Sequence, residues 1–133
     1  MRVTDERIEQ LRHFARIERT AVMEFMGRRG EDPLNTLADL PSVDELVVRE
    51  LRDEMLERRG QMAEFTMARL AATSSADDAA QHRANADKVE FELLREIAEH
   101  NPELTVAVWQ VADRLELPDS AQMPAPPRDA AGS

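Results

Sequence analysis

The stretch TDERIEQLRHFARIERTAVMEFMGRRGEDP, residues 4–33, indicates the fold class most clearly. Thr4 precedes two acids, as at many helix amino termini, and apolar residues then recur at spacings of three and four. Two arginines and Gly30 follow, and the next proline bars continuation of a helix. The pattern predicts a helix over residues 4–28 and an Arg-Arg-Gly stop signal at its end.

The same Arg-Arg-Gly signature returns in DEMLERRGQMA, residues 53–63, but with apolar residues at helical spacing on both sides. A capping box begins at Ser42, so we expect one long helix from residue 43 to about residue 72. Gly60 would then mark a kink or a close approach of another backbone. The first signature would therefore end a helix, whereas the second would lie inside one.

The rest of the chain also favours helices. The stretch PLNTLADL predicts a turn or two of helix ending at Leu40, and a cap at Ser74 or Ser75 predicts a helix to about residue 100. Asn101-Pro102 is expected to cap a shorter helix to about residue 115. We therefore expect an all-α antiparallel bundle of about four helices over residues 1–117, followed by a disordered Pro/Ala-rich tail at residues 118–133.

Composition excludes several functional classes. The chain has 133 residues, a formal net charge of −10 and no cysteine, which removes disulfides and thiol chemistry. Residues 1–73 hold 15 acids and 12 bases, whereas residues 74–133 hold 12 acids and five bases. This charge disfavours nucleic acids and anionic membranes as direct partners and favours a protein partner or self-association. The charged amino terminus, which lacks a long apolar run, predicts a cytoplasmic location.

Each long predicted helix carries a charged residue within its apolar face. On a helical wheel these residues are Glu18, Arg58 and Glu90, which we expect to form a buried polar layer. Arg58→Ala would then lower stability by about 3–5 kcal/mol, or by under about 1 kcal/mol if the groups reach water.

Inward-facing glutamates also leave a metal site open as an alternative. Glu18, Glu54 and Glu90 could hold a hard cation, as in the carboxylate bundles that bind two iron ions. Those sites usually add Glu-x-x-His pairs, and no histidine of this chain has a glutamate three residues before it. We therefore assign no metal and no cofactor.

The sequence contains no phosphate-binding glycine loop and no pairing of a nucleophile with a base, so an interaction protein is favoured over an enzyme. Trp109 and Phe91 lie about 100° from the apolar stripes of their helices and are candidate interface anchors. We expect a helical protein–protein interaction module, such as an adaptor, chaperone or regulator, that self-associates. The alternatives are the carboxylate metal protein and an acidic mimic of nucleic acid that blocks a basic protein surface.

Overall fold

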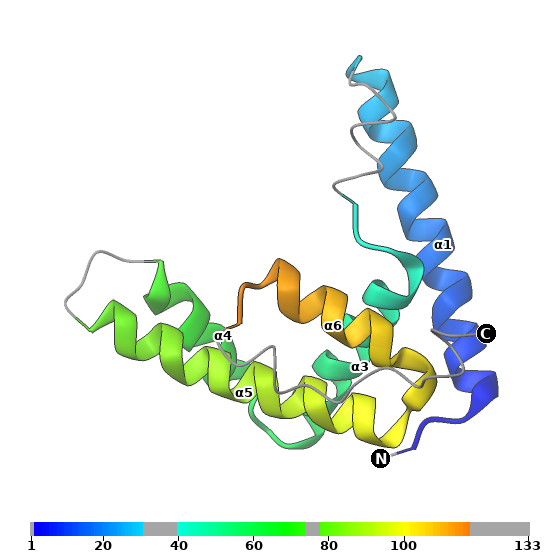
Figure 1. Ribbon diagram of the computed structural model, residues 1–133. Coiled ribbons are helices and arrows are strands. Elements are labelled where there is room, and N and C mark those ends of the chain that lie inside the picture. The colour runs from blue at the N-terminus through cyan, green and yellow to red at the C-terminus, as the bar shows by residue number, and fades with distance from the viewer. Residues whose placement is uncertain (1, 31–39, 74–77, 118–133) are drawn as a thin grey trace.

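The computed structural model describes residues 2–30, 40–73 and 78–117. In these ranges the chain forms only helices, namely α1 (Asp5–Arg28), α3 (Val43–Arg58), α4 (Met62–Ala72), α5 (Ala79–His100), the 3-10 turn η1 (Pro102–Leu104) and α6 (Thr105–Arg114), as Figure 1 shows. The all-α prediction is confirmed. The four-helix bundle is not, because five α-helices are present in the described ranges. The expected tail at residues 118–133 and residues 33–39 of the expected short helix lie outside the described residues.

The predicted continuous helix over residues 43–72 is wrong, because Gly60 ends α3. Its φ is +67°, a left-handed conformation that glycine adopts at little cost. The Gly60 amide donates to the Glu57 carbonyl and the Gln61 amide to the Leu56 carbonyl, at 3.1 and 2.9 Å. This pair of bonds closes a helix with a glycine just past its last turn. Gly30 has a φ of +77° after α1, so both Arg-Arg-Gly signatures are helix stops.

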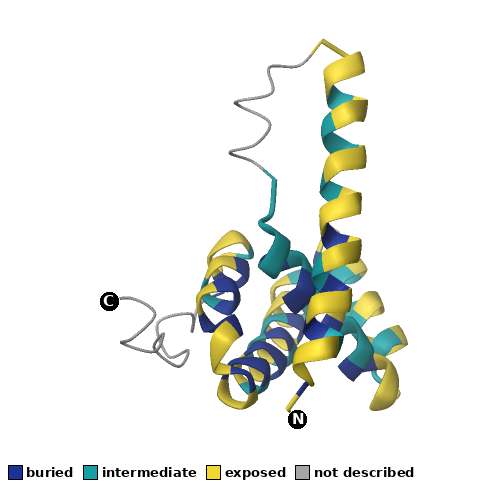
Figure 2. Ribbon diagram, turned by 90° about the vertical axis from the view of Figure 1, so that its right-hand side faces the viewer, coloured by how far each residue is buried: buried dark blue, intermediate teal, exposed yellow. Residues whose placement is uncertain are grey.

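α1 begins where the sequence predicts, with the Thr4 side chain accepting from the Arg7 amide. Its amino-terminal half packs on α3 and buries Ile8, Leu11 and Ala15. Its second half extends beyond the other helices and is largely exposed (Figure 2). The helix therefore offers side chains at a distance from the core.

Ion pairs along the junction hold α1 on α3. The Arg12 Nε donates to Asp44 at 2.8 Å, and Glu9 accepts from the same guanidinium at 2.9 Å. These two carboxylates raise the pKa of Arg12 above its ordinary value, so the group stays charged. Arg7 adds a hydrogen bond to Glu54.

The hydrophobic core lies where α3, α5 and α6 meet. Helix α6 packs against both of the others, and α5 runs along the base of the molecule (Figure 1). Several side chains here are fully shielded from solvent: Val48, Leu56, Leu94, Leu104, Val108, Val111 and Ala112. No helix within the described ranges combines the length and apolarity needed to cross a bilayer.

Asn101 occupies the predicted N-cap position before Pro102, but its side chain joins the amino terminus to the end of α5. Its Oδ1 accepts from the Val3 amide at 2.8 Å, and its Nδ2 donates to the Ile97 carbonyl at 3.1 Å. The cap predicted at Asn101 makes no side-chain bond to η1. The side chain is 1% exposed, so these bonds satisfy polar groups that water cannot reach.

The capping box at the start of α3 is confirmed and also ties down α6. Ser42 and Glu45 exchange the two expected bonds, and the Arg114 Nε donates to Glu45 at 2.8 Å. Arg114 further donates to the Leu40 carbonyl at 3.1 Å. The acidic capping residue therefore fixes the carboxyl-terminal helix against the beginning of α3.

Candidate functional site

The three residues expected to form a polar layer do not come together. Glu90 is 1% exposed, as expected, but Glu18 lies on the surface and the Arg58 side chain is 56% exposed. Arg58 is displaced because α3 ends there, so its side chain is on the last turn and not inside a longer helix. Burial raises the pKa of Glu90 above the ordinary carboxyl value, and the nearby positive charges of Arg52 and Arg69 offset part of this effect.

The buried network that forms instead joins three helices. The Arg52 Nη1 of α3 donates to the Glu90 Oε1 of α5 at 2.7 Å. Arg69 of α4 lies 3.9 Å from the same oxygen and donates to Asp87 at 2.8 Å. Arg69 also lies over the ring of Phe65, 5.4 Å from its centroid. These contacts fix the position of α4 against α5.

The sequence could not single out Arg52 and Arg69 as the partners of Glu90. On the wheel of one long helix, Arg52 lies about 100° from Leu51, beside the apolar stripe and not within it. On the same wheel Arg69 lies 18 residues after Leu51 and therefore at the same angle, so local spacing places it on the apolar side. Local spacing thus indicates charges at Glu90 and Arg69 on apolar faces, but not that they belong to one network.

The candidate metal ligands also remain apart. Glu54 is bonded to Arg7 and lies 3.9 Å from Arg58, Glu90 belongs to the Arg52 network, and Glu18 is exposed. Among the described residues, no group of three or more His, Asp or Glu side chains could hold a metal ion. Glu54 and Glu90 lie in ion pairs with arginines.

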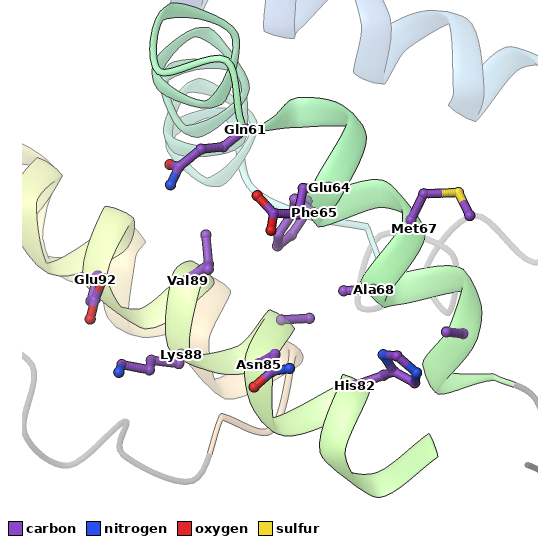
Figure 3. A pocket seen from close by; sticks show the side chains of 12 residues that line it. Gln61, Glu64, Phe65, Met67, Ala68, His82, Asn85, Lys88, Val89 and Glu92 are labelled. Carbon is purple, nitrogen blue, oxygen red and sulfur yellow. The ribbon is translucent and has the colours of Figure 1, made fainter. Parts of the chain in front are cut away.

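In the described part of the chain, a groove with a volume of about 840 Å³ lies between α4 and α5. Figure 3 shows Phe65 and Ala68 of α4 and Val89 of α5 within it. Ala71 and Ala86 also contribute. Small residues on both helices let the backbones lie close together and leave a shallow trough above them.

Polar side chains also line this groove, and exposed apolar residues lie along its α4 side. The polar lining residues are Gln61, Glu64, His82, Asn85, Lys88 and Glu92. On the α4 side, Met67 lines the groove and is 66% exposed, and Leu70 beside it is 61% exposed. A mainly apolar trough that also has polar lining residues resembles the surface that receives an amphipathic helix in protein complexes.

A second exposed apolar surface lies on α1 between residues 14 and 25. Phe14, Ile17 and Phe25 are 64%, 54% and 56% exposed, and Ala21 is exposed between them. The four positions fall on one side of the helix, at angles different from those of the buried Leu11 and Ala15. We call this set, Phe14, Ile17, Ala21 and Phe25, the α1 stripe.

The aromatic residues that the sequence suggested as interface anchors are half-buried. Both Trp109 and Phe91 pack against the core cluster. Neither belongs to the groove or to the α1 stripe. Their role at an interface stays a prediction. The exposure of Met67 and of the α1 stripe was missed because it depends on which helix faces the fold leaves uncovered.

No protein-family model, curated protein or solved structure matches the chain. Its function is therefore inferred from the geometry of its own surfaces.

Proposed function

We propose that this protein is a helical interaction module that binds an amphipathic helix in the groove between α4 and α5. The observation that supports this best is the mainly apolar trough of about 840 Å³, bordered by the exposed Met67. Methionine adapts its shape to different side chains and is enriched at helix-binding surfaces. The ligand in this proposal is the apolar face of a protein helix.

Partly buried ion pairs hold the two walls of the groove in place before a ligand binds. Arg69 is held by Asp87 beneath α4, and Glu90 is held by Arg52 beneath α5, so both walls are anchored to the core. A groove whose walls are fixed before binding loses less conformational freedom when a ligand enters it. The α4 side of the groove has little charge, since Glu64 and Arg69 are the only charged residues of α4.

The proposal is tested by photo-crosslinking from within the groove. Met67→p-benzoylphenylalanine places a reactive group at the groove edge, and Glu99→p-benzoylphenylalanine places one on an exposed position of α5 that does not line the groove. Both variants are expressed in the native cells, irradiated, and their adducts are mapped by mass spectrometry.

The expected result is a discrete adduct from position 67 that maps to one helical segment of a protein and is absent from position 99. A groove without a helix ligand would give no adduct from position 67, or the same diffuse set from both positions. Either of those results would refute the proposed function.

A further inference from the structure

We infer that the groove between α4 and α5 receives the α1 stripe of a second copy of this chain, and that two copies exchange α1 reciprocally. The inference rests on the proposed helix-docking function and names the ligand of the same groove. The chain itself contains a helix of the kind that the groove would bind, because α1 carries the exposed α1 stripe. Its own groove is out of reach, because α1 packs on α3 and extends away from α4 and α5 (Figure 1).

The lengths of the two surfaces match. Phe14 and Phe25 are 11 residues apart, which corresponds to about 16 Å along a helix at 1.5 Å per residue. Helix α4, which forms one wall of the groove, has 11 residues and therefore also spans about 16 Å. The stripe can thus lie along the whole wall without an unsupported end.

The charges of the two surfaces are complementary at the level of the segments that carry them. Residues 13–29 hold four arginines against two glutamates, whereas residues 40–117 hold nine bases against 17 acids. Two copies of residues 13–29 side by side would bring like net charges together. Docking of this segment on residues 40–117 of a second chain brings opposite net charges together, which favours this arrangement over direct pairing of the two segments.

The apolar area available is enough for a specific dimer. Five side chains that are 54–66% exposed form the two surfaces, and they are Phe14, Ile17, Phe25, Met67 and Leu70. At about 200 Å² for a large, fully exposed side chain, they present roughly 600 Å² per chain. Reciprocal docking covers this area in both copies, roughly 1,200 Å², which reaches the lower limit of standard protein interfaces, about 1,200 Å².

Reciprocal exchange also gives a closed assembly. If Phe25 of one copy contacts Met67 of the other, two-fold symmetry makes the second copy return the same contact. Each chain then has both of its apolar surfaces covered. The assembly ends at two chains, each of 15.1 kDa.

The test is a complementation experiment on the purified full chain, using sedimentation velocity and light scattering. Phe25→Glu places a charge in the α1 stripe and leaves the groove intact, whereas Met67→Glu places a charge in the groove and leaves the α1 stripe intact. Val106→Glu is the matched control, because Val106 is a 48% exposed apolar residue outside both surfaces. Far-UV circular dichroism checks that each variant folds, and Ile17→Glu with Leu70→Glu forms a second pair for the same experiment.

The natural chain and Val106→Glu are expected to dimerise, whereas each surface variant alone shows a dimer dissociation constant raised at least tenfold. An equimolar mixture of Phe25→Glu and Met67→Glu restores one intact contact and is expected to form a heterodimer. The inference is overturned if the natural chain is monomeric at submillimolar concentration or if Met67→Glu still dimerises. It is also overturned if the mixture forms no heterodimer. The proposed function survives each of these outcomes if the position-67 crosslink maps to a helix of another protein.

Discussion

Replacing Arg52 by alanine should destabilise the protein far more than replacing Arg58 on the same helix. The Arg52 side chain is 16% exposed and donates the 2.7 Å bond to Glu90, whose side chain is 1% exposed. Arg58 is 56% exposed, and its partner Glu54 lies 3.9 Å away. The two substitutions remove the same chemical group from the same helix, so burial is the main difference between them.

The size of the loss follows from what Glu90 can do without its partner. Removing one member of a buried ion pair costs about 3–5 kcal/mol when the other stays charged. Glu90 can instead take up a proton, and protonating a carboxyl of ordinary pKa near 4.3 at pH 7 costs at most about 3.7 kcal/mol. We therefore expect a loss of about 3 kcal/mol for Arg52→Ala and under about 1 kcal/mol for Arg58→Ala.

Urea unfolding followed by circular dichroism at pH 7 measures both losses. Repeating it at pH 5 should shrink the Arg52→Ala loss, because protonating Glu90 is then easier, and should leave the Arg58→Ala loss nearly unchanged. Equal losses for the two variants at pH 7 would refute a buried network centred on Glu90.

Three further predictions concern Glu90 and the helix ends. The pKa of Glu90 is raised in the folded state, so the native chain binds more protons than the unfolded chain between the ordinary and the raised pKa. The contribution of Glu90 to the unfolding free energy therefore falls as pH rises through that window. Urea titrations should show the unfolding free energy of Glu90→Gln increasing relative to that of the natural chain as pH rises; a relative decrease would mean that the arginines outweigh burial. Gly60→Ala should lower the unfolding free energy by about 1 kcal/mol, because Gly60 has a left-handed φ. Gly27→Ala should raise the unfolding free energy by up to about 1 kcal/mol, because Gly27 lies inside α1 with open space around it. Equal shifts of the two thermal unfolding midpoints would contradict this. Glu116 has a φ of 53° just past α6, so Glu116→Gly should stabilise the chain by about 1 kcal/mol in thermal unfolding, and a lower midpoint would show that the carboxylate matters there.

The starts of α1 and α3 could be predicted from the sequence because their capping interactions are local, whereas α5 begins at Ala79 and not directly after the caps predicted at Ser74 or Ser75. Thr4 and Ser42 each bond to an amide three residues ahead, so a short stretch of sequence contains the whole interaction. The helix end at Gly60 could not be predicted in the same way. An isolated glycine between apolar residues at helical spacing is compatible with a tolerated kink or with a left-handed stop, and the local sequence does not decide between them.

The surfaces could not be predicted because exposure is a property of the whole fold. The sequence pattern around Phe14 and Phe25 is as compatible with burial as the pattern around Leu11. The packing of α1 on α3 decides which of these side chains is buried. The groove likewise needs two helices separated by the break after Ala72. The burial of Glu90 could be predicted from local spacing, whereas its pairing with Arg52 depends on how α3 and α5 pack together.

The most direct test of α1 docking in the groove is nuclear magnetic resonance of methionine methyl groups in the Phe25→Glu chain, whose groove is intact. A peptide of residues 10–30 is added, with the same peptide carrying Phe25→Glu as control. The account predicts a saturable shift of the Met67 signal with the natural peptide, no shift of the Met67 signal with the control peptide, and little change at Met55, which is buried in the core. A Met67 signal that stays in place at millimolar natural peptide, or that moves equally with both peptides, would contradict it.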